Sequence, residues 1–368
     1  MIEFKALNKE ELEQFINSKE YIRVKTLPIT KHRALSHIKN PRADKDDVLL
    51  IIAYEESDIV GYLGILPDLL FLSNNKSIKC GWLSCFWVDS SKRGKGIGEQ
   101  LIRKSLEYWD NKIMSAEFVA FTQVIYDKTK AFGNPLEKSG IKLYFRMDLQ
   151  TILPPKKRIF QRVKKYLKVT DALINKLLDV RFFLFRNLLP SVKIEYVTEI
   201  DDEIRKFISR FQFGRHFKRN IKELNWIINY PWIISAPYQD FDSQRYYFSS
   251  IDKSFNFYCL KIRNDSDELI AFLVFSKRNN NLKLPFCYME KTVLNEVAKI
   301  IENHILNWRI NSFITFNPEL VTYFSTHKTK SIFKKKIERK YMISNTINTL
   351  IKIEENKIQD GDGDCAFT

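Results

Sequence analysis

The chain is poor in cysteine, glycine and proline, with 5 Cys, 11 Gly and 11 Pro among 368 residues. Its cysteines form no Cys-x-x-Cys pair, which argues against a disulfide framework and against a zinc site. No stretch reaches the roughly eighteen nearly uncharged apolar residues that a membrane span needs. The opening segment carries Glu10, Glu11 and Glu13 and no apolar secretory region. We therefore expect a cytoplasmic protein that holds no metal ion.

Acidic residues are fewer than basic ones. The chain has 60 Lys and Arg but 44 Asp and Glu, which gives a net charge of +16. A charge of this size attracts anionic partners but says nothing about fold. The composition is 45% hydrophobic and 14% aromatic, so the chain can bury a sizeable core. The length favours two domains.

Much of the positive charge lies in two runs. Residues 154–168 hold seven basic side chains and no acid, and residues 328–340 hold seven basic side chains and one acid. Such runs fit phosphate contacts, an acidic membrane surface or a merely solvated face.

The order of apolar patterns divides the chain at residues 1–150, 151–190 and 191–368. The first part alternates short apolar runs with helical patterns, which is typical of an α/β layer. The second is a basic and then apolar helical linker, and in the third a similar order begins again. In the first part we predict strands at 2–7, 48–54, 59–66, 80–88, 117–124 and 141–149, and helices at 8–18, 30–38, 97–110 and 127–139.

One motif carries chemistry. A strand ending in Val88-Asp89 runs into Arg93-Gly94-Lys95-Gly96-Ile97-Gly98, and an amphipathic helix follows. Glycines let the backbone approach a ligand, and the free amides at the start of a helix form an anion site. The spacings of the Rossmann and P-loop motifs are absent. A pyrophosphate is the expected ligand.

This strand, turn and helix resemble those of the GNAT superfamily of N-acetyltransferases. The resemblance implies an α/β (α+β) fold with two tandem GNAT-like domains, each a mixed, mostly antiparallel sheet flanked by helices. It also implies a bulged strand whose exposed backbone pairs with the pantetheine arm of acetyl-CoA or another acyl-CoA. The cofactor-binding residues would be Phe86, Trp87, Val88, Arg93, Gly94, Lys95, Gly96, Ile97 and Gly98.

Acyl transfer to an amine needs a neutral amine, a stabilised thioester oxygen and a protonated leaving thiolate. Many family members place a tyrosine acid four residues before the glycine that ends the last helix, but counting back from Gly140 gives Leu136. The strand 80–88 also lacks the glutamate that others use. The candidate substitutes are Tyr126 and Tyr144 as acids and His32 and His37 as bases, although each also fits a structural role.

Acceptor specificity in the superfamily comes largely from the segment that is 25–47 here. Its Arg33, Asn40 and Arg42 are candidate substrate-binding residues, with the two arginines suited to a carboxylate or phosphate. The second half joins its strand 282–289 to the next helix without glycines, so we expect no second acyl-CoA site there.

A narrower resemblance rests on LNWIINYPW (224–232) and DGDGD (360–364), which are similar to segments of tandem acyltransferases from bacterial surface-polysaccharide gene clusters. It implies a nucleotide- or lipid-linked amino sugar as acceptor. Asp360, Asp362 and Asp364 then either contact that acceptor or lie in a disordered tail.

We therefore expect an acyl-CoA-dependent N-acyltransferase that transfers the acyl group directly. One alternative is an aminoacyl-tRNA-dependent peptidyltransferase, which also pairs two GNAT-like domains but does not need the glycine turn. The other is a non-catalytic basic module that binds a membrane or nucleic acid. The turn argues against a nucleic-acid partner, and residues 154–168 leave a peripheral contact with the inner membrane surface open.

Overall fold

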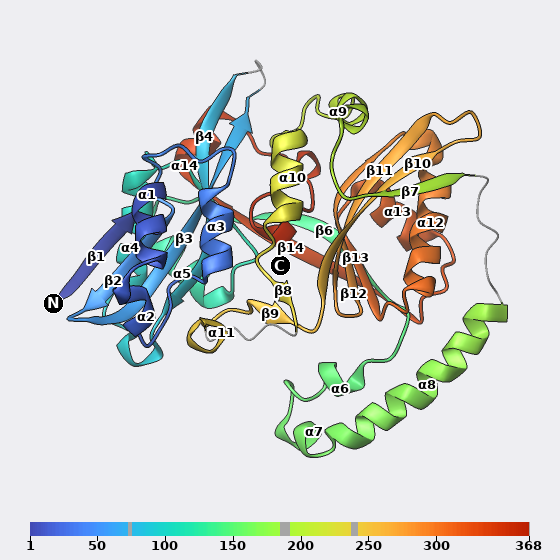
Figure 1. The fold of residues 1–368 in the computed structure, drawn as a ribbon, viewed down its shortest axis with the longest axis horizontal. Helices are drawn as coiled ribbons and strands as arrows, with labels where there is room; N and C mark the ends of the chain where they lie inside the picture. Colours follow the sequence, from blue (N-terminus) through green and yellow to red (C-terminus); the bar gives the residue numbers. More distant parts are fainter. Residues whose placement is uncertain (73–75, 185–191, 237–241, 368) are drawn as a thin grey trace. The chain divides into compact units, whose positions relative to one another are not determined.

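The computed structural model describes residues 1–72, 76–184, 192–236 and 242–367. The chain forms two compact units, each assembled from separate stretches of sequence (Figure 1). Unit 1 comprises Met1–Lys138, Glu199–Phe255 and Arg339–Thr368, and unit 2 comprises Ser139–Thr198 and Asn256–Glu338. The expected contiguous divisions at 150 and 190 therefore differ from the observed units. The difference arises because two strands carry the chain from one unit into the other: β6 (Leu136–Tyr144) enters unit 2 and β14 (Phe333–Ile343) returns to unit 1.

Unit 1 contains the strand, turn and helix of the glycine motif. Its strands follow the order β1-β2-β3-β4-β5-β14, antiparallel except for the β4–β5 pair. Besides β14, its elements are β1 (Ile2–Leu7), α1 (Lys9–Ile16), α2 (Lys19–Arg23), α3 (Lys31–Ile38), β2 (Leu50–Glu55), β3 (Asp58–Phe71), β4 (Ser77–Val88), α4 (Ile97–Tyr108), β5 (Ile113–Ala116), α5 (Ala120–Thr129), α9 (Asp202–Ser209), α10 (Ile221–Asn229), β8 (Ile234–Ser235), α11 (Asp242–Arg245), β9 (Ile251–Asp252) and α14 (Asn345–Leu350).

Both faces of this sheet are buried, because successive side chains of a strand point to opposite sides. Leu50 and Ile52 of β2 pack in a cluster with α1–α3, whereas Ile51 and Ala53 pack in a second cluster with α4. The amphipathic pattern of α4 supplies Leu101 to that second cluster. The sheet thus separates a face covered by α1–α3 from a face covered by α4.

Unit 2 has a similar plan. Its strands follow the order β6-β13-β12-β11-β10-β7, in which only β12 and β13 are parallel among the registers described. Helix α12 supplies Val297, Ile301 and Ile305 to the core. Besides β6, the elements are α6 (Leu149–Ile152), α7 (Arg158–Arg162), α8 (Lys164–Leu184), β7 (Lys193–Val197), β10 (Phe255–Arg263), β11 (Leu269–Arg278), β12 (Asn281–Met289), α12 (Leu294–Asn307), β13 (Ser312–Thr315) and α13 (Pro318–Thr326). The predicted fold class, mostly antiparallel sheets flanked by helices, is confirmed.

The sequence prediction was wrong between residues 113 and 139. The predicted strand 117–124 is mostly helix α5, and the predicted helix 127–139 contains the start of β6. Left-handed backbone at Glu117 (φ 51°) separates β5 from α5, and the same conformation at Lys130 (φ 57°) ends α5. Gly140 consequently lies in a strand, so counting back from it does not locate the tyrosine of the last helix. Tyr126 lies in α5 itself.

Candidate functional site

Strand β4 contains the bulge that the family resemblance implied. Tyr62 of β3 lies opposite Trp87 and Gly64 lies opposite Ser84, so β4 has an extra residue between these pairs. Cys85 in this interval adopts a left-handed conformation with φ 47°. In the described structure, β4 pairs with β5 only from Gly81 to Leu83. Beyond the bulge, the backbone of β4 is thus left without a strand partner on the β5 side.

The glycine turn follows directly after β4. Gly94 (φ 84°) and Gly96 (φ 76°) both occupy the left-handed region that favours glycine, and Gly96 is the N-cap of the 12-residue helix α4. A Cβ atom added at either glycine would meet nothing within 4 Å. The space beside both glycines is therefore open, and the first amides of α4, together with the helix dipole, can stabilise an anion there.

Gly98 serves a different purpose. A Cβ atom there would lie 3.0 Å from Cζ of Phe86 and 3.1 Å from Cδ1 of Ile125. This glycine lets the start of α4 pack closely against β4 and α5. It fixes the direction of the helix that presents the amides.

The basic side chains around the turn are partly committed to protein partners. Lys92 and Lys95 both pair with Glu55, the latter at 3.0 Å, and these two hydrogen bonds lower the pKa of Glu55 to about 2. Arg103 pairs with Glu99 at 2.8 Å. Arg93 lies 5.7 Å from the ring centroid of an exposed phenylalanine on α5. Arg93 is thus the basic side chain of the turn best placed for phosphate.

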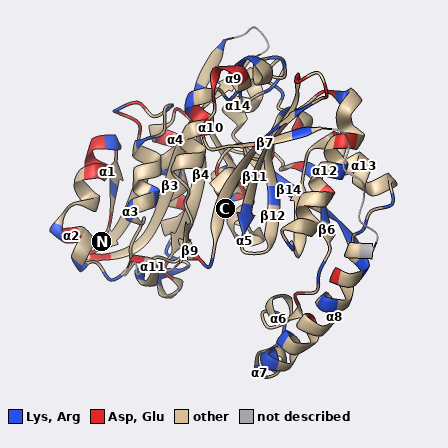
Figure 2. Cartoon of the chain, turned by 45° about the vertical axis from the view of Figure 1, so that its right-hand side comes forward, with Lys and Arg blue, Asp and Glu red and all other residues tan. Residues whose placement is uncertain are grey.

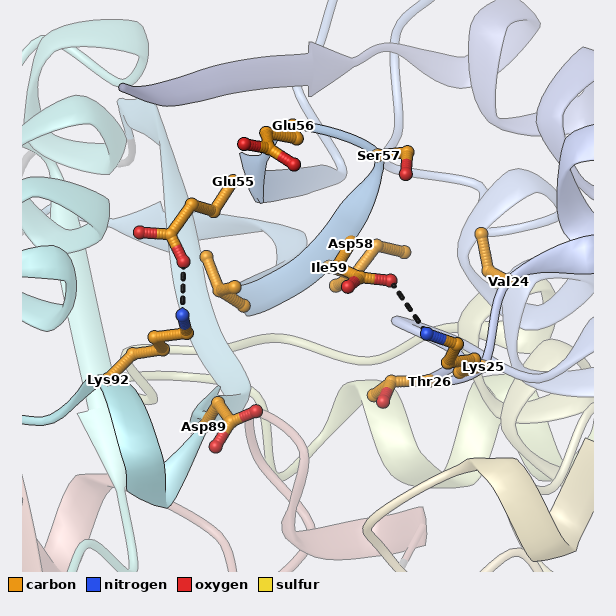
Figure 3. A pocket seen from close by; sticks show the side chains of 11 residues that line it. Val24, Lys25, Thr26, Glu55, Glu56, Ser57, Asp58, Ile59, Asp89 and Lys92 are labelled. Atoms are coloured by element: carbon orange, nitrogen blue, oxygen red, sulfur yellow. Dashed lines mark hydrogen bonds and ion pairs between the residues drawn. The ribbon is translucent and has the colours of Figure 1, made fainter.

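A pocket of about 400 Å³ lies beside the turn, at the β2–β3 hairpin (Figure 3). Figure 3 shows the pairs Glu55–Lys92 and Asp58–Lys25, the second at 3.5 Å. Glu56 and Asp89 also line it, so carboxylates outnumber amines. This electrostatic balance repels phosphate, and we do not assign the pocket to an acyl-CoA.

The two faces of β4 after the bulge have different surroundings. Phe86 and Val88 pack against the α4 cluster, whereas Cys85 and Trp87 pack against the α1–α3 cluster. On this second face Trp87 stacks on Tyr62 with ring centroids 5.2 Å apart. A ligand lying along the β4 backbone would therefore meet different neighbours on the two sides of the strand.

Buried polar side chains of Arg33, Ser84, Tyr62 and Tyr246 lie in this part of unit 1. Among them, Nη2 of Arg33 and Oγ of Ser84 have no hydrogen-bond partner among the described residues. The Arg33 guanidinium lies 3.6 Å over the ring of Trp232. Buried polar groups are rarely left unsatisfied, so this cluster is suited to receive a polar ligand or water.

Residues 359–367 insert into unit 1 close to this cluster. Gly363 (φ 67°) packs so tightly on Trp82 of β4 that a Cβ atom would lie 2.8 Å from the ring. Phe367 stacks on Trp232 with centroids 4.6 Å apart. The tail is therefore ordered, and the alternative that it is disordered is wrong for the described residues.

Asp364 is the tail residue with the most unusual environment. Burial is the main cause that raises its pKa to about 7, and the charge of Glu117 adds to it, whereas Arg33 opposes the rise. The Asp364 charge in turn raises the pKa of Cys85 and Tyr126. The half-buried carboxyl thus interacts electrostatically with the bulge of β4 and with α5.

The neighbouring Asp362 has a structural role. It is fully buried and accepts hydrogen bonds from Nε and Nη2 of Arg219, whose Nη1 and Nη2 donate to Asp68 at 3.0 and 2.8 Å. Arg42 also pairs with Asp68 and donates to Glu223 at 3.0 Å. This buried network holds the tail against the sheet.

The predicted catalytic histidines are both engaged with the protein. His37 is buried and stacks on Trp232, and its Nδ1 lies 3.2 Å from the carbonyl of Ile65. Burial and the Arg33 charge lower its pKa to about 3, so it stays neutral at physiological pH. Nε2 of His32 lies 2.9 Å from the carbonyl of Trp232. The position of His37 therefore does not suit a general base, whereas the role of His32 stays a prediction.

The two predicted tyrosines lie in different units. Tyr126 is buried in unit 1, its ring 4.9 Å from that of Phe132, and burial raises the pKa of its hydroxyl. Tyr144 lies in unit 2, where its ring packs 5.9 Å from that of Phe333. Only Tyr126 belongs to the unit that holds the glycine turn.

Of the predicted substrate-binding residues, only Arg33 has a buried side-chain nitrogen without a hydrogen-bond partner in the described part of the chain. Asn40 donates to the carbonyl of Pro67 at 2.8 Å and accepts from the amide of Arg42 at 3.0 Å, so it shapes the loop. Arg42 is committed to the buried ion-pair network. Sequence reasoning missed Tyr62 and Tyr246, because no local motif marks either residue.

Among the residues that the structure describes, no group of three or more His, Cys, Asp or Glu could hold a metal ion. Among the described helices, none combines the length and apolar character needed to cross a membrane.

Comparison with known proteins places the motif and the fold. Residues 10–131 match the family model described as Acetyltransferase (GNAT) family. The chain is similar to a GCN5-related N-acetyltransferase from Anabaena variabilis, with a TM-score of 0.50 and 12% identity over 93% of this chain and 72% of that one. It is also similar to Saccharomyces cerevisiae N-myristoyltransferase with bound myristoyl-CoA, with a TM-score of 0.51 and 11% identity over 94% of this chain and 79% of that one. At these identities the likeness shows a shared fold. No curated protein matches the chain.

Proposed function

We propose that this chain, which carries a GNAT acyltransferase domain within residues 10–131, transfers an acyl group from acyl-CoA to the amine of an amino sugar. The observation that carries the proposal is the bulged β4, whose backbone is unpaired on the β5 side and leads into the open glycine turn. Backbone of Phe86–Val88 would pair with pantetheine, and the amides from Arg93 to Gly98 would bind the pyrophosphate. The thioester would then lie near Cys85.

Side chains near Trp87 and Asp364 supply groups for the acceptor. The exposed ring of Tyr247 lies 6.2 Å from that of Trp87, which gives two aromatic faces for the apolar side of a sugar ring. The half-buried carboxyl of Asp364 is the nearby anion for an ammonium group. These features favour an amino sugar over a purely apolar amine.

Asp364 is our candidate for the general base. An alkylammonium group must lose a proton before its nitrogen can attack, and a base with a pKa near the working pH is best suited to accept it. Asp364 meets this condition with its pKa of about 7. Arg33, by opposing the rise in this pKa, would keep part of the carboxylate ionised at neutral pH.

The transfer would proceed by direct attack. Asp364 first takes a proton from the ammonium group, and the neutral nitrogen then bonds to the thioester carbonyl carbon. As the carbon–sulfur bond breaks, the CoA thiolate takes a proton from Tyr126, and the second proton that the nitrogen releases restores the Tyr126 hydroxyl. Burial raises the pKa of the Cys85 thiol, so it stays protonated and is poorly suited to form an acyl-enzyme. We propose acetyl-CoA as the donor, and longer acyl-CoAs are tested alongside it.

Calorimetric titration with acetyl-CoA and then with longer acyl-CoAs tests the donor site. Gly94→Val puts a side chain into the open turn and should weaken binding at least tenfold. Gly214→Val is the matched control, because Gly214 has a similar φ of 73° and equally open surroundings. Absence of binding by the unaltered protein, or equal binding by both variants, would refute the assignment. A free-thiol assay with UDP- and dTDP-linked amino sugars then tests the acceptor.

A further inference from the structure

Helix α8 of unit 2 is held to its own unit along one face. Phe182 is buried in the core of unit 2. Asp171 accepts the backbone amides of Leu149 and Gln150 at 2.9 Å each. Asp179 pairs with the Arg146 guanidinium. These contacts fix the rotation of the helix about its axis, and so determine which side chains point outward.

The opposite face of α8 exposes an apolar stripe. Six large apolar side chains recur at intervals of three or four residues, which places them on one side of a helix. Each is between 55% and 76% exposed. The stripe consists of Tyr166, Val169, Leu173, Leu177, Val180 and Phe183. A contiguous apolar face of this kind marks an interaction site.

Positive charge surrounds the stripe and leads up to it. The basic residues of the run 154–168 are all exposed, and no ion pair joins them to a carboxylate in the described structure. Figure 2 shows Lys and Arg along α7 and α8. Lys176 lies one turn from Leu173 and from Val180, beside the apolar face. The two acidic residues of α8, Asp171 and Asp179, are turned to the inner contacts.

Two partners could cover the apolar stripe: a second copy of α8 or an anionic membrane. The positive charge around the stripe favours the membrane. A second copy of α8 would bring an equally basic helix against this one without outward carboxylates to neutralise it. An anionic membrane attracts the lysines and arginines and accepts the apolar stripe at the boundary between headgroups and acyl chains. A helix with an apolar face and basic flanks is suited to lie in that plane.

We propose that α8, with the preceding basic run, is an interfacial helix that docks unit 2 on an anionic lipid surface. The proposal does not depend on acyl transfer. It gives the exposed stripe of α8 and the unpaired basic run a single role.

Vesicle flotation tests this docking with the full chain. We expect the protein to float with vesicles of phosphatidylcholine and phosphatidylglycerol, and not with phosphatidylcholine alone. The double variant Leu173→Glu and Leu177→Glu should lose at least tenfold in vesicle affinity. The control carries the same charge change at exposed apolar residues of unit 1, Phe213→Glu and Leu350→Glu, and should bind like the unaltered protein.

A second variant tests the charge. Replacing Lys156, Lys157, Lys164 and Lys165 with Glu should abolish flotation, and raising the salt concentration should weaken that of the unaltered protein. The proposal is overturned if the unaltered protein stays unbound or if the α8 variant binds as well as the control. Analytical sedimentation gives the other overturning result. If the unaltered protein is a dimer that does not bind vesicles, and the α8 substitutions alone turn it into a monomer, the stripe binds a second copy of the chain.

Discussion

Replacing Asp364 with Asn tests the proposed base, because the amide keeps the shape of the side chain and cannot accept the ammonium proton. A positioned general base contributes about 10²- to 10⁴-fold to a rate, so we expect kcat to fall by that factor at neutral pH. Acyl-CoA binding should be unchanged, since the donor site is made by the turn. In the unaltered protein kcat should rise with pH to a plateau, with its midpoint at about 7.

The same substitution should stabilise the fold. The pKa of Asp364 rises from 3.8 to about 7 on folding, and each pKa unit corresponds to about 1.36 kcal/mol. The folded protein therefore keeps the proton longer than the unfolded chain, and stability falls as the pH rises from 3.8 towards 7. Removing this charge should stabilise the protein by about 4 kcal/mol at pH 8, and progressively less as the pH falls to 3.8.

Two measurements on Asp364→Asn distinguish these claims. A thiol-release assay between pH 5.5 and 9 follows the rate, and urea unfolding at pH 5 and pH 8 follows the stability. An unchanged kcat with the same midpoint would eliminate Asp364 as the base. A loss of activity without a gain in stability at pH 8 would show that the surroundings of the carboxyl do not raise its pKa.

Three further substitutions test the surroundings of this carboxyl. Asp68→Ala leaves two buried guanidinium groups short of a partner and should cost about 3–5 kcal/mol in urea unfolding; a cost below 1 kcal/mol would contradict the buried network. Gly363→Ala puts a Cβ 2.8 Å from the Trp82 ring at φ 67°, so the free energy of unfolding should drop by about 1–3 kcal/mol, and unchanged stability would mean that the tail packs elsewhere. Arg33→Met removes the charge that opposes the rise in the pKa of Asp364, so the midpoint of the rate profile should move to higher pH. An unchanged midpoint would show that the charge of Arg33 does not act on Asp364.

The strand, turn and helix around Gly94 and Gly96 could be predicted from sequence because their signals are local. Glycine favours left-handed turns, and the amphipathic pattern that predicts α4 begins immediately after the glycines in the sequence. Helix α5 carried no such signal, because its N-cap Val119 makes no side-chain capping bond and the apolar run after Glu117 looks like a strand. The start of α5 depends on the left-handed backbone at Glu117, which no sequence pattern predicts.

The candidate site could be predicted only where it is made of consecutive residues. The acidic tail was noticed in the sequence, but whether Asp362 or Asp364 meets a cation depends on Arg219 and Arg33, which lie far away along the chain. The pairing of β14 with β5 brings that tail into unit 1, and strand pairing between distant segments leaves no local trace. Long-range contacts thus decide which acid can act as a base.

The return of β14 to the first sheet has a consequence for synthesis of the protein. A nascent chain that has left the ribosome as far as residue 338 still lacks the part of unit 1 that begins at Arg339. The turn at Gly94 can form early, but Asp364 joins unit 1 only after the segment that begins at Arg339 has been translated. Donor binding can therefore precede catalytic competence during biosynthesis, and a prematurely stopped chain would hold acyl-CoA without the residue proposed to activate the amine.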